Sequence, residues 1–254
     1  MEDKNQAVLL LEDGTVFHGN SIGLVGTTTG EIAFNTGMTG YQEVFTDPSY
    51  YGQILVMTTT HIGNYGVHET EIESEGMKIA GMVIKKFSED YSRDSGMKSL
   101  QEYMVDNLKV GISDIDTRSL VRHIRSKGAM NAIISSETLN IEELKIKLDA
   151  VPSMAGLELS SKVATKEEFE EKSENSKYKV ALLDFGVKKN IINCLVERDC
   201  HVKVFPLNTP LKVLEDFNPD GYMLSNGPGD PSAMPESINI VSEFNDLTSS
   251  SKRT

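Results

Sequence analysis

The chain has 254 residues, which is enough for one large or two modest domains with a hydrophobic core. Hydrophobic residues make up 39% of it and charged residues 25%, and no apolar run approaches the ~20 residues that span a bilayer. We therefore exclude a membrane-spanning protein. With 38 acidic and 25 basic residues the formal net charge is -13, which disfavours binding to phosphate backbones, so nucleic acid is not an expected partner.

The N-terminus and the cysteines indicate the compartment. Residues 1–6 (MEDKNQ) lack the cationic start and apolar stretch of a signal peptide, which predicts a cytoplasmic protein. The two cysteines, Cys194 and Cys200, are too few for a disulfide framework or a structural zinc site and fit a reducing environment. The five histidines show no metal-like spacing, so we expect no metal site.

The first half of the chain is predicted to form an α+β domain. Residues 7–11 and 15–17 are apolar runs on either side of an Asp13-Gly14 turn, which predicts a hairpin. Further strand-like runs, separated by stretches rich in Gly, Thr and Asn, lie at residues 30–35, 53–59, 78–86 and 129–135. Helical spacing occurs at Leu100, Met104 and Leu108, and again at Leu120, Val121 and Ile124.

Two helices also have end signals. For the helix that contains Leu120, Asp116 is a suitable N-cap and Gly128 follows the basic last turn. A later helix begins at Asn140, where Glu143 three residues on completes a pattern like a capping box.

A domain boundary is predicted in residues 161–177, where charged side chains dominate as in a solvated linker. Residues 1–160 then form the first domain and residues 178–254 the second. In the second domain strands alternate with helices, which predicts parallel strands joined by helical crossovers. The strands are expected at 179–184, 201–205 and 221–225, the helices at 188–197 and 210–217, and a disordered tail at 249–254.

A glycine-rich loop, residues 225–231 (SNGPGDP), follows the third of these strands, and ligands of open α/β sheets bind beyond the carboxyl ends of strands. Gly227 and Gly229 allow close approach of the backbone to a ligand, while Pro228 restricts φ. Backbone N–H groups would then face a developing oxyanion. A tight turn that merely needs glycine explains the pattern equally well.

Other candidate positions are weaker. Residues 184–186 (DFG) lie between a strand and a helix, where amides can hold an anion, but without a phosphate-loop pattern a structural turn is favoured. Ser49 lies in a polar turn that by itself indicates no function. Neither cysteine lies at a strand-to-helix elbow between small residues: Cys194 falls inside a predicted helix and Cys200 where a strand begins.

With these segments located, the sequence resembles the small, glutamine-hydrolysing subunit of carbamoyl phosphate synthetase from residue 7 to about residue 240. In the first domain the resemblance rests on residues 34–43 (FNTGMTGYQE), 46–50 (TDPSY), 61–64 (HIGN) and 114–118 (DIDTR). In the second it rests on residues 184–191 (DFGVKKNI) and 225–231.

The resemblance implies an α/β protein, with an N-terminal α+β domain followed by an incomplete doubly wound class I amidotransferase-like domain. In the family a cysteine attacks the glutamine amide, a histidine backed by a glutamate moves the protons, and ammonia passes through a tunnel to the large subunit. By resemblance Ser49, Gly227 and Gly229 contact glutamine. The implied partner is the large subunit, which forms a heterodimer with this subunit and carries ATP and metal, so no cofactor is expected in this chain.

The sequence departs from the family at the catalytic centre. The family's Gly-x-Cys-x-Gly elbow follows the glycine loop, and no such motif occurs in the 254 residues. We therefore expect no catalytic residue, no glutamine hydrolysis by this polypeptide, and an exposed apolar edge and face in the second domain. Three functions stay open: an ammonia-supplying small subunit, a non-catalytic module that docks on the large subunit through its N-terminal domain and, on fold analogy alone, a mononucleotide-binding protein.

Overall fold

The computed structural model describes the backbone of residues 6–251 and the side chains of residues 6–243. The chain divides into two compact units between Ser153 and Met154. This differs from the boundary predicted in residues 161–177. That charged segment contains β10 (Phe169–Glu171), which is a strand of the sheet in the second unit. It is therefore part of the second unit and not a linker in front of it.

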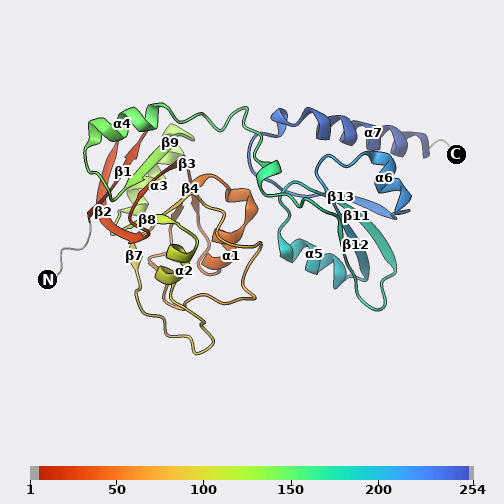
Figure 1. The fold of residues 1–254 in the computed structure, drawn as a ribbon, viewed down its shortest axis with the longest axis horizontal. Helices are drawn as coiled ribbons and strands as arrows, with labels where there is room; N and C mark the ends of the chain where they lie inside the picture. Colours follow the sequence, from red (N-terminus) through yellow and green to blue (C-terminus); the bar gives the residue numbers. More distant parts are fainter. Residues whose placement is uncertain (1–5, 252–254) are drawn as a thin grey trace. The chain divides into compact units, whose positions relative to one another are not determined.

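Seven strands of the first unit close into a barrel in the order β1-β2-β8-β6-β4-β3-β9 (Figure 1). The β3–β4, β4–β6 and β6–β8 pairs are parallel and the others antiparallel. The bounds are β1 Gln6–Leu11, β2 Val16–Gly23, β3 Thr27–Asn35, β4 Gln53–Met57, β6 Gly81–Val83, β8 Val110–Ser113 and β9 Asn131–Ser135. A separate two-stranded sheet pairs β5 (His61–Ile62) with β7 (Lys86–Phe87).

The unbroken apolar run of β1 is explained by burial on both faces. Leu9 and Leu11 belong to the largest core cluster, together with buried side chains of α3, whereas Val8 and Leu10 pack with α4. A third cluster packs α1 and α2 against β4 and β6. The helices of this unit are α1 Tyr41–Thr46, α2 Leu100–Asp106, α3 Thr117–Lys127 and α4 Ile141–Asp149.

The predicted N-terminal hairpin is confirmed, since β1 and β2 pair antiparallel across the Asp-Gly turn. The ends of α3 are confirmed as well: Asp116 accepts a hydrogen bond from the Ser119 N–H, and Gly128 follows the last turn. One helical position is wrong. Leu108 lies beyond the end of α2, where it is 72% exposed and has a φ of 55°.

The start of α4 is confirmed in part. Asn140 accepts hydrogen bonds from the N–H groups of Glu142 and Glu143, as expected of an N-cap. The side chain of Glu143 does not complete a capping box, because it pairs with Lys147 at 2.9 Å instead. Of the two hydrogen bonds of a capping box, the helix therefore has the one accepted by the Asn140 side chain and lacks the one accepted by the Glu143 side chain.

Tyr65 holds the loop that follows β5 against the start of α1. Its hydroxyl accepts hydrogen bonds from the N–H groups of Gly40 and Tyr41, at 2.9 and 3.0 Å, and its ring stacks on that of Tyr41 with centroids 4.1 Å apart. The Arg93 guanidinium lies over the Tyr65 ring and binds both carboxylate oxygens of Glu71, at 2.6 and 3.0 Å. An ion pair thus fixes the aromatic stack.

We expect Glu71→Gln to weaken this attachment in a pH-dependent way. The hydrogen bond from Arg93 outweighs burial and holds the pKa of Glu71 below its usual value of 4.5. A carboxyl group with a lowered folded pKa stabilises the fold above its unfolded pKa, and this contribution is lost as the pH falls through the folded value. E71Q should therefore lose about 1 kcal/mol in urea unfolding at neutral pH. Below pH 4.5 the difference from the wild type should shrink.

The control for this prediction is Glu69→Gln, which removes the same charge from an exposed position two residues away. It should leave the free energy of unfolding within about 0.5 kcal/mol of the wild type. A difference in the free energy of unfolding between E71Q and the wild type that stays constant from pH 7 to pH 3 would contradict the prediction. It would show that the charge of Glu71 does not stabilise the fold.

The second unit is built on a four-stranded sheet in the order β10-β12-β11-β13 (Figure 1). β11 is parallel to both β12 and β13, which confirms the predicted parallel strands and helical crossovers, while β10 is antiparallel to β12. The bounds are β11 Tyr178–Asp184, β12 Cys200–Pro206, β13 Gly221–Leu224, α5 Lys189–Val196, α6 Leu211–Asp216 and α7 Pro235–Ser251.

Helices cover both faces of this sheet. α5 packs on one face, where Ile192 joins Leu182 and Val202, and α6 and α7 pack on the other, where Leu214 joins Phe205. β13 is at the sheet edge with its Tyr222 and Leu224 side chains 40% and 39% exposed, in line with the expected apolar edge. The expected exposed face is wrong, because α5 covers one face of the sheet and α6 and α7 pack on the other.

Part of the predicted disordered tail is helical, since α7 continues to Ser251. Residues 252–254 lie outside the described part of the chain.

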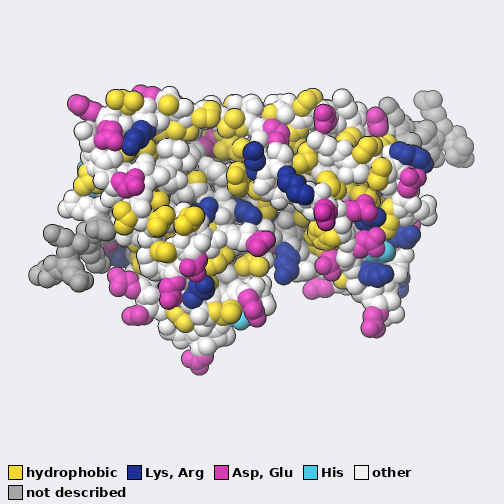
Figure 2. Space-filling model, in the orientation of Figure 1, with side chains coloured by type: hydrophobic (Ala, Val, Ile, Leu, Met, Phe, Trp, Pro, Cys, Tyr) yellow, Lys and Arg dark blue, Asp and Glu magenta, His cyan; other side chains and the backbone are white. Residues whose placement is uncertain are grey.

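Two surface properties bear on possible partners. Among the described residues no helix is both long and apolar enough to cross a membrane. On the face shown in Figure 2, Lys and Arg side chains are scattered among acidic ones over both units.

Candidate functional site

The glycine-rich loop, residues 225–231, follows β13 and is held by the chain segment 156–160 of the same unit. Three hydrogen bonds join them, each given with its donor first: Ser160 Oγ to Pro228 O at 3.2 Å, Asp230 N to Leu157 O at 2.9 Å, and Gly156 N to Asp230 Oδ2 at 2.8 Å. The bond from Gly156 also holds the pKa of Asp230 below its usual range, so the anchoring carboxylate stays ionised at neutral pH.

Both glycines of the loop are required by close contacts. A Cβ atom on Gly227 would lie 2.2 Å from the backbone oxygen of Phe185 and 2.7 Å from Ser160 Oγ. Gly229 has a φ of +86°, and a Cβ atom there would lie 2.6 Å from the backbone oxygen of Leu157. Packing alone is therefore enough to explain the glycines, which supports the tight-turn interpretation without excluding a ligand loop.

The hydrogen-bonding direction at Gly229 favours a ligand loop in addition. Gly229 forms an antiparallel bridge with Glu158, in which the N–H of Asp230 donates to the carbonyl of Leu157. In such a pair the bridged residues direct their own N–H and C=O groups away from each other. The N–H of Gly229 therefore points away from the segment that holds the loop.

A cavity of about 330 Å³ adjoins the loop within the second unit. It is lined by both glycines, by Phe185 after β11 and by one side of α7, including Ile238. The walls are mostly apolar, with a few serine hydroxyls among them. This matches the usual composition of a small-molecule site, an apolar cleft with few polar groups.

The turn after β11 is a structural turn, as favoured from the sequence. The carboxylate of Asp184 is buried and accepts three backbone hydrogen bonds at 2.7 Å, from the N–H groups of Gly186, Val187 and Thr165. The amides of the turn between β11 and α5 that could hold an external anion, those of Gly186 and Val187, are therefore occupied by the chain's own side chain.

Ser49 belongs to the first unit, whereas the two glycines belong to the second. It lies in a short 3-10 turn, Pro48–Tyr50, and its N–H donates to Asp47 Oδ1 at 2.9 Å. Asn35 donates from its side chain to the hydroxyl of Tyr50 at 3.0 Å and ties the turn to the end of β3. Ser49 itself is half-buried.

The cysteines lie where the sequence predicts, Cys194 in α5 and Cys200 buried at the start of β12, and both are free thiols. Two histidines have carboxylate partners that sequence spacing could not reveal: His123 lies 2.6 Å from Asp13, and His201 lies 2.8 Å from Glu170. In the described part of the chain no group of three or more His, Cys, Asp and Glu side chains could hold a metal ion.

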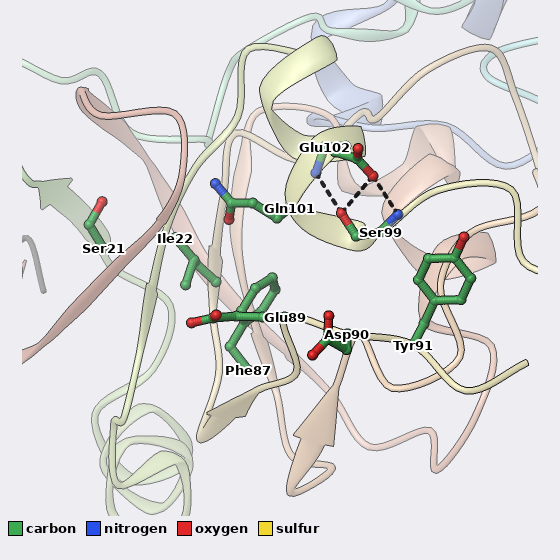
Figure 3. A pocket seen from close by; sticks show the side chains of 9 residues that line it. All are labelled: Ser21, Ile22, Phe87, Glu89, Asp90, Tyr91, Ser99, Gln101 and Glu102. Atoms are coloured by element: carbon green, nitrogen blue, oxygen red, sulfur yellow. Dashed lines mark hydrogen bonds between the residues drawn. The ribbon is translucent and has the colours of Figure 1, made fainter. Parts of the chain in front are cut away.

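Another cavity, about 630 Å³ in the first unit, contains none of the predicted residues (Figure 3). Several of its polar groups already bond to the protein. Ser99 and Glu102 form the capping box of α2, drawn as dashed lines in Figure 3, and Gln101 bonds to the backbone of Gly23. The remaining carboxylates, on Glu89 and Asp90, are exposed. We assign no site there.

The two units match two known domain families. Residues 9–134 match the carbamoyl-phosphate synthase small chain, CPSase domain, and residues 181–249 match glutamine amidotransferase class-I. A barrel unit of the first kind and an α/β unit of the second kind therefore follow each other in one chain.

Whole-chain relatives agree. The carbamoyl phosphate synthase small chain of Aquifex aeolicus (strain VF5) is 43% identical over 253 residues, which cover 95% of this chain and 68% of that protein. That of Synechococcus sp. (strain ATCC 27144 / PCC 6301 / SAUG 1402/1) is 41% identical over 253 residues, covering 95% and 65%. The chain belongs to the carbamoyl phosphate synthase small chain family, and it spans about two thirds of the length of these relatives.

Among solved structures, the aminopeptidase from Aneurinibacillus sp. strain AM-1 aligns with 80% of this chain and 49% of that one. The TM-score of 0.29 and the identity of 8% are too low to bear on fold or function.

Proposed function

We propose that these residues form part of the ammonia supply of a glutamine-dependent carbamoyl phosphate synthase. In this role ammonia from glutamine reaches a large chain, which makes carbamoyl phosphate for arginine and pyrimidine synthesis. Membership of the family supports the proposal. The single structural observation that carries it is the glycine loop. Hydrogen bonds hold this loop on the segment 156–160, and the N–H of Gly229 points away from that segment.

Each predicted site residue has a role in this proposal. Gly227 and Gly229 let the loop backbone approach the glutamine side chain, and the N–H of Gly229 donates to the oxyanion formed on the amide carbon. Ser49 contacts glutamine from the first unit. The large chain is the partner and carries ATP and metal, and the complex works in the cytoplasm.

We propose further that these 254 residues do not hydrolyse glutamine by themselves. A nucleophilic thiolate needs a base and an exposed elbow between a strand and a helix. Cys194 lies within α5, where the neighbouring positions are helical, and Cys200 is 8% exposed with its thiol 3.7 Å from the backbone oxygen of Arg198. Neither position offers the geometry of attack on an amide.

A non-catalytic docking module is the second candidate. In it the N-terminal domain docks on the large chain, and the sheet edge at β13 offers a further surface, with the half-exposed side chains of Tyr222 and Leu224 and no charged residue. Exposed apolar edges of this kind are typical of surfaces that pair with another chain.

Carbamoyl phosphate synthesis by a mixture of this chain and a relative's large chain tests both candidates together with the proposed lack of glutamine hydrolysis. We expect co-elution of the chains, synthesis from ammonium salts, and none from glutamine, because docking does not require the nucleophile. Synthesis from glutamine would contradict the proposed lack of activity. Failure of the chains to co-elute, with a full-length small chain co-eluting in parallel, would contradict both candidates.

A further inference from the structure

β10 is attached to the outer edge of the second unit's sheet in an unusual way. Its three residues pair antiparallel with β12, with Glu170 opposite Lys203, yet all three side chains are exposed. Even Phe169 remains 39% exposed. Apolar burial, which holds most strands in place, therefore contributes little to holding this one.

Charge complementarity holds it instead. Glu170 lies 2.8 Å from His201, and Lys203 lies 3.0 Å from Glu168 and 3.6 Å from Glu170. The side chains of His201 and Lys203 are only 18% exposed, whereas those of Glu168 and Glu170 are 53% and 43% exposed. The basic side chains are thus largely covered by the second unit, whereas the acidic side chains that contact them remain largely exposed to solvent.

An aromatic ring completes this surface. Phe217, at the end of α6, meets the His201 ring edge-on at 5.2 Å and lies 5.8 Å from the Lys203 ammonium. Lys179, which pairs with His201 across β11 and β12, lies 5.1 Å from the same ring. Three basic groups around one ring make a surface suited to an acidic ligand.

We propose that residues 165–177 are a displaceable strap, which covers a docking surface for an extended acidic segment of a partner protein. The surface consists of the outer edge of β12 with Lys179, His201, Lys203 and Phe217. The partner segment pairs with β12 in the place of β10, and two of its carboxylates, two residues apart, take the positions of Glu168 and Glu170. This inference does not depend on glutamine chemistry or on the large chain.

The geometry indicates why the strap can leave. Ion pairs with half-exposed carboxylates stabilise only weakly, and a three-residue ladder adds few hydrogen bonds. In the free protein the strap occupies the surface because it is part of the same chain, which gives it an effective concentration on the order of millimolar. A partner segment with the same charges and a longer strand therefore competes with it directly.

The spacing of the strap's charges defines what fits. Successive residues of a strand point to opposite faces, so only every second side chain reaches the basic surface. Glu168 and Glu170 obey this spacing, whereas Phe169 and Glu171 face the other way. The expected partner carries acidic residues at alternate positions of an extended segment.

The test uses the whole chain and a synthetic peptide of residues 165–176 (TKEEFEEKSENS) as the probe. The variant E168Q/E170Q weakens the strap but leaves the surface intact. The variant E167Q/E171Q removes the same number of charges from two neighbouring glutamates that take no part in the ion pairs of Glu168 and Glu170 with His201 and Lys203. Binding is followed by NMR shifts of the Val202 and Val204 amides, and strap release by hydrogen exchange at Phe169 and Glu171.

We expect about tenfold tighter peptide binding and about tenfold faster strap exchange in E168Q/E170Q than in the wild type. The control variant should behave as the wild type, and a peptide carrying E168Q and E170Q should not bind. Unchanged strap exchange together with peptide binding equal to the wild type would overturn the proposal, and so would equal binding of the charged and neutral peptides. Unchanged amide shifts at Leu182 in β11 show that each variant is folded.

Discussion

Replacing Gly227 by alanine is expected to destabilise the second unit by about 2–3 kcal/mol, because the new methyl group has no space. It would meet the backbone oxygen of Phe185 at 2.2 Å and the backbone carbon of the same residue at 2.9 Å. Backbone atoms at the end of a buried strand cannot move aside as a flexible side chain can. The loop must therefore shift, and with it the N–H groups proposed to face glutamine.

Gly221→Ala is the matched control in the same unit. A Cβ atom on Gly221 would meet no atom within 4 Å, and its φ is not in the left-handed region. We expect a change of less than about 0.5 kcal/mol, with alanine slightly favoured by its lower entropy when unfolded. The free energy of unfolding is measured by urea denaturation, and hydrogen exchange of peptides from β11 and β12 reports on the second unit. Equal stability of the two variants would show that the loop tolerates the displacement.

Replacing Asp184 by alanine is expected to cost about 3 kcal/mol or more, since it leaves three backbone donors without their acceptor. The N–H groups of Gly186, Val187 and Thr165 all converge on this carboxylate at 2.7 Å. The first two begin the connection to α5, and the third ties the strap segment to the end of β11. Loss of the carboxylate should therefore loosen both connections at once.

The variant Asp184→Asn keeps the shape of the side chain but removes its charge. The amide oxygen can still accept from Gly186 and Val187, while its NH₂ group would face the N–H of Thr165. We expect a loss of about 1–2 kcal/mol, intermediate between the wild type and D184A. D184A and D184N of equal stability would contradict the importance of the hydrogen bonds from Gly186 and Val187.

The sequence predicted the second unit more fully than the first, for a physical reason. Parallel strands buried on both faces leave continuous apolar runs, and the helices between them keep their own period. β11, β12 and β13 were therefore located within one or two residues. β10 was missed because its glutamates suggest solvent, and only the basic residues on β12 explain why they lie in a sheet.

Closure of the barrel could not be predicted from local pattern. It depends on pairs distant in the chain, such as Asn20 with Ser113 between β2 and β8. β8 is only four residues long and was not recognised as a strand at all. The site shows the same division: the position of the glycine loop follows from its place after a strand, whereas its anchoring by Ser160 and Asp230 requires the folded chain.

Ammonia release from glutamine is the most direct measurement of whether these residues hold a complete glutaminase centre. The purified chain is assayed alone and with a relative's large chain, beside a full-length small chain from the same relative. We predict no release above background in either sample while the full-length chain is active. Release by the 254-residue chain that C194S or C200S abolishes would contradict the placement of both thiols outside the reaction.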